Sequence, residues 1–355
     1  MRKNKLWLIA AAFLTLGTGC KISSDENNLN AAPEGSFSMV VIPDTQEYFG
    51  RDTKKEPDSN DEITNPVFES QTRWIAENID SQHIVFVSHV GDIVDKNTHS
   101  QWELARQCID NIHGIVPYGI SAGNHDMTSN GNSSLFQQYF PASLYEKFDW
   151  YGGSFPGDDQ YPAVSGNNAN SYQLFSAGGI NFIVFHLECN APDTVLNWAS
   201  NILESYHSRF AIVTTHMFLG PLENPETPKD YYDAPKGVMR WSKRHGSRGN
   251  SPRQMWDKCF YKHENLHIMF SGDQSRTNAM YMQLTGGNGN VVHALLSDYM
   301  SQPGPLRIYR FFPTNKEIEV ITYDTMTQEI LSETSIVPDK EKHNFKISLD
   351  LKSDN

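Results

Sequence analysis

Short apolar runs that end in polar residues recur along this chain, and they predict buried β-strands. Each of five such runs leads directly into a polar fragment that contains Asp, Asn or His. These runs cover residues 39–42, 84–90, 115–120, 210–213 and 266–270. Continuous apolar runs of this length are typical of strands that are buried on both faces. We therefore expect strands whose ends carry polar side chains to one edge of a sheet.

Amphipathic segments lie between these runs and predict helices over 65–79, 100–113, 194–206 and 253–262. In the first of them, apolar residues recur at mixed three- and four-residue steps, which suits a helix with one buried face. The alternation of strands with helices favours an α/β fold.

A second set of strands is predicted at 172–175, 181–187, 291–297, 306–312, 318–323 and 345–351. The fourth and fifth of these flank Pro313-Thr314-Asn315, which is a hairpin signal. The last one alternates apolar and polar residues, which indicates a strand with a single buried face.

The N-terminus has the pattern of an export signal and not of a folded segment. Three basic residues precede an apolar stretch over 6–16, which is followed by small residues and then by Cys20. This order is typical of a signal peptide, and a cysteine after small residues resembles a bacterial lipoprotein cleavage site. We expect residues 1–20 to form a lipoprotein signal that is cleaved before Cys20, so that Cys20 becomes the lipid-carrying first residue. The alternative is cleavage near Gly19, with Cys20 left as an ordinary thiol.

The composition limits which partners we expect. The chain of 355 residues carries 29 Lys and Arg against 42 Asp and Glu, a formal net charge of −13. An acidic chain lacks the positive field that non-specific nucleic-acid binding needs, so we expect no nucleic-acid partner. Residues 21–36 are polar and without apolar periodicity, which predicts a flexible linker. We expect one domain over 37–355, an envelope location with a lipid anchor in the membrane, and no protein partner.

Besides Cys20 the chain has three cysteines, Cys108, Cys189 and Cys259. This sparse, odd set is no disulfide framework, although one disulfide remains possible. Their spacing is not that of a zinc site, so we interpret them as small buried residues.

Polar fragments at strand ends are the candidate chemistry of this chain. They are Pro43-Asp44-Thr45-Gln46, Gly91-Asp92, Gly123-Asn124-His125-Asp126, Thr215-His216 and Gly272-Asp273. In an open α/β sheet the residues just beyond the strand C-termini converge on one crevice. Carboxylate, amide and imidazole groups gathered in this way are ligands for hard and borderline cations. A lone Asp after a strand is more often a turn or cap residue, but the tetrapeptide at 123–126 is hard to ascribe to chance.

The order of these fragments resembles that of the calcineurin-like metallophosphoesterases, whose pattern runs D-x-H, G-D, G-N-H-D, H and G-H-x-H. Further landmarks between about residues 37 and 330 resemble a bacterial subgroup that begins with Pro-Asp-Thr-Gln. The resemblance implies a four-layer α/β/β/α sandwich of two mixed sheets. It also implies metal ligands at Asp44, Gln46, Asp92, Asn124, His216 and Asp273. His125 would face the leaving oxygen of a substrate, with Asp126 orienting its imidazole.

The chain departs from the family pattern at its two ends. Gln46 stands in place of a His, and Gly272-Asp273-Gln274-Ser275 stands in place of G-H-x-H. By the family's division of ligands, Gln46 and Ser275 belong to the same metal position. We therefore expect one firmly held ion and a weak or empty first position, the one to which Gln46 and Ser275 belong. An oxygen-rich ligand set favours Mn²⁺, Mg²⁺ or Ca²⁺ over Zn²⁺.

Two functions remain open from the sequence. The first is metal-dependent hydrolysis of phosphomonoesters or phosphodiesters, which the intact tetrapeptide with His125 favours. The second is binding of a metal or phosphorylated ligand without turnover, which the departures from the family's metal-ligand pattern favour. The basic segment 240–248 is either solvated surface or a phosphate-binding loop, with Arg244 and Arg248 as the candidate substrate-binding residues.

Overall fold

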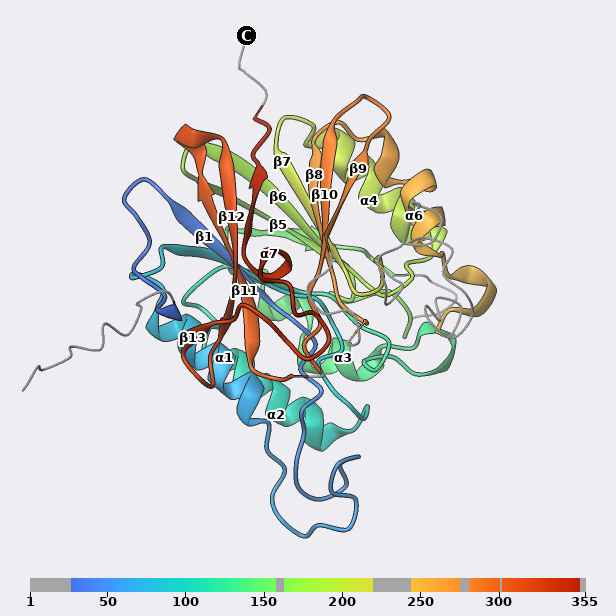
Figure 1. Ribbon diagram of the computed structural model, residues 1–355. Helices are drawn as coiled ribbons and strands as arrows, with labels where there is room; N and C mark the ends of the chain where they lie inside the picture. Colours follow the sequence, from blue (N-terminus) through green and yellow to red (C-terminus); the bar gives the residue numbers. More distant parts are fainter. Residues whose placement is uncertain (1–26, 158–162, 220–243, 275–280, 301, 352–355) are drawn as a thin grey trace, which may run out of the picture.

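The computed structural model describes residues 27–157, 163–219, 244–274, 281–300 and 302–351. Figure 1 shows that these residues form two β-sheets with helices on either side. The predicted signal peptide and the lipidation residue Cys20 lie outside the described residues. Among the residues that are described, no helix is both long enough and apolar enough to cross a membrane.

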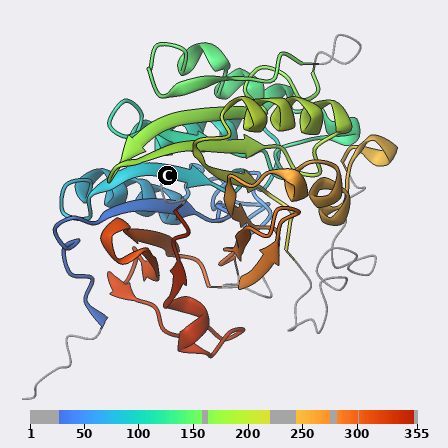
Figure 2. The ribbon, with the colours of Figure 1, turned by 90° about the horizontal axis from the view of Figure 1, so that it is seen from above.

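The first sheet has seven strands and joins the N-terminal and C-terminal parts of the chain. Its strands are β1 (Phe37–Ile42), β2 (Ile84–His89), β3 (Tyr118–Ile120), β11 (Pro305–Phe312), β12 (Glu317–Asp324), β13 (Glu329–Ile330) and β14 (Phe345–Ser348). Their order is β13-β12-β11-β1-β2-β3, and β14 also pairs with β12. β1 is parallel to β2 and antiparallel to β11, so the sheet is mixed. Figure 2 shows the C-terminal strands in red beside the blue N-terminal strand.

The second sheet also has seven strands and is mixed. Its strands are β4 (Tyr151–Ser154), β5 (Ser171–Ala177), β6 (Ile180–Leu187), β7 (Phe210–Thr215), β8 (Leu266–Ser271), β9 (Tyr281–Thr285) and β10 (Val291–Leu296). Their order is β4-β5-β6-β7-β8-β10-β9, and β6, β7, β8 and β10 run parallel. The C-terminal ends of these four strands therefore lie at the same edge of the sheet.

Helices cover the outer faces of the two sheets. They are α1 (Pro66–Glu77), α2 (His99–Asp110), α3 (Ser134–Tyr139), α4 (Asp193–Ser205), α6 (Pro252–Lys258) and α7 (Lys340–His343). α1 begins where the side chain of Asn65 accepts a hydrogen bond from the Phe68 amide and Pro66 occupies the first helical position. α6 begins with a capping box between Ser251 and Gln254. Because the apolar residues of α1, α2, α4 and α6 share one face, these four helices bury that face against a sheet.

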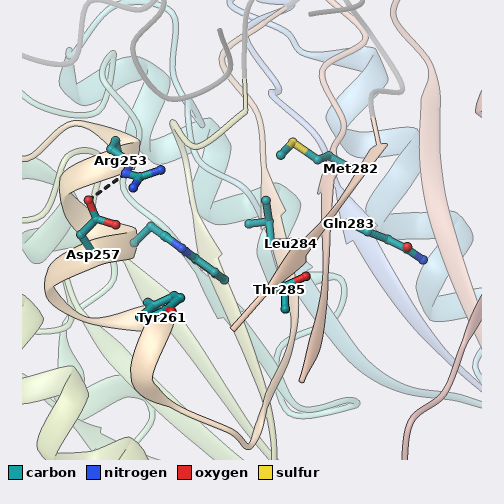
Figure 3. Close-up of a pocket in the computed structure, with 8 residues that line it drawn as sticks. Arg253, Asp257, Tyr261, Met282, Gln283, Leu284 and Thr285 are labelled. Atoms are coloured by element: carbon teal, nitrogen blue, oxygen red, sulfur yellow. Dashed lines mark hydrogen bonds and ion pairs between the residues drawn. The ribbon is translucent and has the colours of Figure 1, made fainter. Parts of the chain in front are cut away.

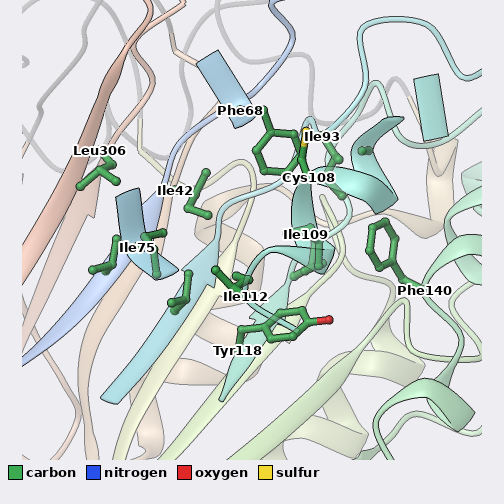
Figure 4. Packing of buried hydrophobic residues seen from close by; sticks show 14 of the residues in the cluster. Ile42, Phe68, Ile75, Ile93, Cys108, Ile109, Ile112, Tyr118, Phe140 and Leu306 are labelled. Atoms are coloured by element: carbon green, nitrogen blue, oxygen red, sulfur yellow. The ribbon is translucent and has the colours of Figure 1, made fainter. Parts of the chain in front are cut away.

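Three hydrophobic clusters define the four layers. One lies between the first sheet and α1 and α2, where Phe68, Ile75 and Ile109 pack near Ile42 (Figure 4). A second lies between the second sheet and α4 and α6, and a third lies between the two sheets. Along β1 the residues alternate between the outer cluster and the inter-sheet cluster because successive strand side chains point to opposite faces. The four-layer α/β/β/α sandwich of two mixed sheets is thereby confirmed.

The structure differs from the sequence predictions at several element ends. β3 begins at Tyr118 and not at 115, because Ile115 lies in the turn after α2 with 59% of its surface exposed. The last predicted helix ends at Lys258, and a 3₁₀ turn, Phe260–Lys262, follows it. The hairpin at Pro313–Asn315 is confirmed.

The described part of the predicted linker packs against the domain. The amide of Ala32 donates to the Ser81 carbonyl (2.8 Å), and Gln82 Nε2 donates to the Asn30 carbonyl (3.2 Å). Leu29 contacts the cluster beneath α1 and α2. Within the described part of the predicted linker, Leu29, Asn30 and Ala32 are therefore in contact with the domain.

Candidate metal centre

The polar fragments from both sheets meet at one place. The carbonyl of His216, after β7, accepts the Gly272 amide after β8 (2.8 Å), and the Asp92 carbonyl, after β2, accepts the Thr45 amide after β1 (3.1 Å). The two sheets are joined there by His216 Nδ1, which lies 3.1 Å from the Val90 carbonyl oxygen. Because a carbonyl oxygen only accepts, this contact places the ring proton on Nδ1 and leaves Nε2 as the free ring nitrogen.

Asp44, Asp92 and His216 form the centre of the site. All three are buried, and they offer ligand atoms that lie within 4.8 Å of one another. His216 Nε2 is 3.3 Å from Asp92 Oδ1 and 3.9 Å from Asp44 Oδ2. Two carboxylates and one imidazole at this spacing suit a divalent cation.

Unpartnered atoms in this group fit a bound cation. His216 Nε2 and Asp44 Oδ1 are both buried and have no hydrogen-bond partner. Burying polar atoms without a partner costs free energy, and native proteins rarely leave them so. A cation between the three side chains would satisfy both atoms, so the residues present fit a metal site.

The protonation of the centre follows from its buried charges. Burial raises the pKa of Asp44 well above its usual value, and the nearby Asp298 carboxylate raises it further. Burial also opposes ionisation of Asp92, but the nearby charges, that of His216 above all, outweigh it and hold the pKa of Asp92 below its usual value. For His216, the attraction of Asp92 and Asp44 overcomes burial and raises its pKa. In the absence of a cation, a proton on His216 thus neutralises part of the carboxylate charge.

Two amide side chains of the predicted ligand set contact the central carboxylate. Gln46 Nε2 donates to Asp92 Oδ2 (2.5 Å), and Asn124 Nδ2 donates to the same oxygen (3.1 Å). The backbone amide of His125 donates to Asp92 Oδ1 (2.7 Å). Asp92 is therefore the hub of the group. A half-turn of either amide would replace its nitrogen by its oxygen, which is the atom that a cation binds.

Asp273 completes the group from β8. Its Oδ1 lies 3.6 Å from His216 Nε2, and its backbone amide donates to Asp44 Oδ2 (3.4 Å). The preceding Gly272 leaves no room for a side chain, because a Cβ there would collide with Asp44 Oδ1. The structure thus brings together all six predicted ligand residues, whereas Ser275 lies outside the described residues.

His125 lies at the rim of the centre with a quarter of its side chain exposed. Its Nδ1 is 2.8 Å from the Asp95 backbone carbonyl, which fixes the proton on Nδ1 and leaves Nε2 for another partner. The Asp95 carboxylate is 3.7 Å from the same nitrogen and pairs with Lys54 Nζ at 2.5 Å. Asp95 and Lys54 were not among the sequence-predicted site residues.

Asp126 has different partners from those that the sequence predicted. Its carboxylate accepts the backbone amides of Gly123 (2.7 Å), Ile93 (2.9 Å) and Val94 (3.1 Å). No hydrogen bond or ion pair of these described residues joins it to the His125 ring, where Asp95 lies instead. The predicted contact between Asp126 and the His125 ring is therefore not formed, because backbone amides occupy the oxygens of this buried carboxylate. Burial and the nearby Asp92 raise the pKa of Asp126 to about 6.

Asp298 is a further residue beside the centre that the sequence analysis did not name. It is buried and lies two residues after β10, whose neighbour β8 is followed at the same distance by Asp273. Burial raises its pKa to about 7, and the charge of Asp273 adds to this effect. The same rule that found the other residues, an apolar run followed by Asp, applies to 291–298 and would have found it.

The two candidate substrate-binding arginines have separate environments. Arg248 Nη2 donates to the Asn130 carbonyl (2.6 Å). Arg244 Nε is buried and has no hydrogen-bond partner. Burial raises the pKa of the Cys189 thiol, and this thiol lies within electrostatic range of His216, Asp273, Asp92 and Arg244 alike. Arg244 thus acts on the same buried thiol as three groups of the centre, whereas Arg248 is not among the groups that shift this pKa.

A surface pocket lies apart from this group. It has a volume of about 520 Å³ and is lined by residues of α6, of the 3₁₀ turn after α6 and of the edge strand β9, among them Asp257, Tyr261 and Leu284 (Figure 3). None of the predicted site residues lines it. Cys108, Cys189 and Cys259 are buried free thiols, as predicted.

Comparisons with known proteins indicate a family to which this chain is similar. Residues 38–276 match the family model described as "Calcineurin-like phosphoesterase". The chain is 26% identical over 298 residues to "Uncharacterized protein YvnB" of Bacillus subtilis (strain 168), covering 81% of this chain and 20% of that protein. The chain thus spans about a fifth of the length of the curated relative.

Two solved structures are similar in overall shape. For purple acid phosphatase PPD1 from yellow lupin seeds, the TM-score is 0.47 at 14% identity, covering 89% of this chain and 55% of that one. For a dimetal phosphatase from Danio rerio, the TM-score is 0.47 at 10% identity, covering 88% of this chain and 99% of that one.

Proposed function

The chain belongs to the calcineurin-like phosphoesterase family, and from this premise we propose that it hydrolyses phosphate esters with the help of a divalent metal ion. The observation that carries the proposal is the buried group of Asp44, Asp92 and His216 with two unpartnered ligand atoms. When bound there, a divalent cation would neutralise phosphoryl oxygens and supply an activated water. Asp44, Asp92, His216, Asn124 and Asp273 would hold it.

His125 has the geometry of a proton donor to the leaving oxygen. The Asp95 carbonyl holds its Nδ1 (2.8 Å), so Nε2 is the atom that faces a substrate. The Asp95 carboxylate lies 3.7 Å from Nδ1 on the same side of the ring, which leaves Nε2 as the position for the proton that general-acid catalysis transfers. In this proposal His125 is the catalytic residue, and Asp126 acts only by holding the loops of Asp92 and Asn124 together.

The ligand set favours Mn²⁺, Mg²⁺ or Ca²⁺ over Zn²⁺. His216 is the only imidazole in the proposed set, and the other ligand atoms are oxygens. Gln46 faces Asp92 where the family pattern has a His, which supports one firmly held ion and a weaker first position. The substrate would be a phosphorylated small molecule, with Arg244 rather than Arg248 nearest to its phosphate.

The location in the cell envelope is proposed from the N-terminal sequence. The basic residues, the apolar stretch and Cys20 have the order of a lipoprotein signal. A lipid on Cys20 would hold the domain at the membrane surface.

The test is hydrolysis of p-nitrophenyl phosphate and its bis-ester by the full chain in detergent, after removal of metal and addition of Mn²⁺, Mg²⁺, Ca²⁺ or Zn²⁺. We expect turnover with the first three ions and at least a 100-fold lower kcat in His125→Ala, the loss typical of a missing general acid. His99→Ala is a matched control, since His99 contacts Tyr139 on the surface.

Absence of turnover with every ion, while metal still raises the melting temperature, would favour the second function. The protein would then be a binding protein that has kept the metal centre of a hydrolase. Metal analysis showing two firmly bound zinc ions would contradict the proposed metal preference.

A further inference from the structure

A second buried pair of ionisable groups lies beside the centre and outside the proposed ligand set. Glu188 follows β6, and His245 lies in the segment 244–250 before α6. Both side chains are fully buried, and Glu188 Oε2 is 3.6 Å from His245 Nε2. Neither atom has a hydrogen-bond partner. Two buried groups of this kind are tolerated only when each offsets the cost of burying the other.

Glu188 is held between two strand ends that carry proposed ligands. Its carbonyl accepts Thr215 Oγ1 (3.3 Å), one residue before His216. The next amide, of Cys189, donates to the Ala122 carbonyl (2.8 Å), two residues before Asn124. One side-chain oxygen, Oε1, accepts Ser165 Oγ and Asn170 Nδ2. The other oxygen, Oε2, is thereby aimed at His245.

His245 connects Glu188 to the segment 244–250. Its ring packs so closely on Gly131 that a Cβ there would collide with it. Two further contacts hold the segment: the Asn250 amide donates to the Asn190 carbonyl (3.3 Å), and Asn190 Nδ2 donates to the Asn250 carbonyl (3.1 Å). The segment 244–250 is therefore held at its far end by Asn190 and near its start by Glu188.

The residue next to His245 is Arg244, whose buried Nε has no hydrogen-bond partner. A guanidinium carries five donors and binds phosphate in a fixed geometry, so it loses affinity when its backbone is displaced. The position of Arg244 depends on where His245 is fixed, since adjacent residues share a peptide plane.

We propose that Glu188 and His245 are positioning residues, which hold the segment 244–250 against the strand ends so that Arg244 is presented to the substrate phosphate. The substrate named in this inference rests on the proposed function. The contact between Glu188 and His245 does not depend on it. Glu188 and His245 touch neither the substrate nor the cation in this proposal.

The first test measures amide hydrogen exchange in the full chain, which needs no activity. Glu188→Gln and His245→Gln are compared with wild type at the amides of Arg248, Gly249 and Asn250. We expect exchange at these amides to rise about tenfold in both variants, because the loop opens more often once the pair is lost. Glu319→Gln is the matched control, since Glu319 also faces a buried partner, Arg310, at 3.6 Å on a distant strand.

The second test measures kinetics with p-nitrophenyl phosphate. In both variants KM is expected to rise about tenfold while kcat stays within about threefold, the split that loss of substrate binding produces. The double variant Glu188→Gln/His245→Gln is expected to match the single variants, since the two residues act as one unit. His245→Gln, which lies in a loop, decides the outcome if Glu188→Gln does not fold.

Unchanged exchange at 248–250 in the variants would overturn the positioning role. Additive effects in the double variant, or a fall in kcat without a change in KM, would also overturn it. A wild-type protein without turnover would count against the proposed function alone, because the exchange experiment would still decide whether the pair holds the segment.

Discussion

At the scale of single residues, Asp92 organises the centre. It accepts hydrogen bonds from Gln46, Asn124 and the His125 amide, and it faces His216. The carboxylate can meet these partners because Asp92 adopts a positive φ of 51° after Gly91, whose φ is 106°. A Cβ on Gly91 would come within 2.8 Å of the Gly123 amide nitrogen, so glycine is required where these two loops cross.

Asp298 belongs to the same scale, and its carboxylate is expected to strengthen cation binding. In Asp298→Asn we expect the Kd for Mn²⁺, measured by isothermal titration calorimetry, to rise about tenfold, the usual effect of removing a group that surrounds the ligands. The physical reason is that the asparagine cannot ionise, so it cannot supply the negative charge that a cation would draw from Asp298 beside Asp44 and Asp273. Asp257→Asn, on the surface of α6, is the control. An unchanged Kd would show that Asp298 does not contribute to cation binding.

At the scale of elements, the loops after β2 and β3 are joined by one buried carboxylate. Asp126 accepts amides from Ile93 and Val94 in the first loop and from Gly123 in the second. These amides would otherwise be buried without an acceptor. The Gly-Asn-His-Asp tetrapeptide thus contains both the residues proposed for catalysis and the carboxylate that holds the two loops together.

Asp126→Asn is therefore expected to affect stability more directly than chemistry. The asparagine side chain offers one acceptor oxygen in place of two, so at least one amide loses its partner. We expect the free energy of unfolding, measured with urea, to fall by about 2 kcal/mol. Asp95→Asn, which is near His125 but accepts no buried amide from these loops, should keep its stability. A variant Asp126→Asn of wild-type stability without turnover would instead restore the catalytic role predicted from sequence.

At the scale of the whole molecule, polar residues connect the two sheets within an apolar interior. His186 on β6 is 2.7 Å from Ser88 Oγ on β2 and 2.7 Å from Gln173 Oε1 on β5. Ser88 Oγ in turn lies 2.7 Å from Thr214 Oγ1 on β7. Burial lowers the pKa of His186 to about 3, and the nearby His89 adds to this effect. The sandwich therefore holds this histidine in its neutral form.

This neutral histidine makes the sandwich sensitive to acid. The unfolded chain takes up the proton near pH 6.5, whereas the folded chain takes it up only near pH 3, so the contribution of His186 to stability falls as pH drops between these values. We expect His186→Gln to remove about 1.4 kcal/mol per pH unit from the slope of unfolding free energy between pH 6 and 4. Urea unfolding at several pH values measures this slope. Equal slopes in the two proteins would show that His186 is already protonated in the folded state.

The sequence by itself determined most of the central strands and the helices α1, α2, α4 and α6, and it identified the polar residues that follow those strands; β4, β9, α3 and α7 were not predicted. Apolar runs predict the strands that end near Asp44, Asp92, His216 and Asp273, because the ends of parallel strands share one edge. The same reasoning covers Asp298, although it was not applied there. The information that the sequence provides is local, because it gives the type of each residue and its position after a strand.

Only the tertiary structure decided which group faces which. It placed Asp95 rather than Asp126 beside His125, set Arg244 and Arg248 in different surroundings, and paired Glu188 with His245. These partners lie tens of residues apart or depend on the turn of a single side chain, and no periodicity encodes such contacts. The physical reason is that a buried polar group takes whichever partner the packing leaves within reach, and that choice exists only once both sheets have come together.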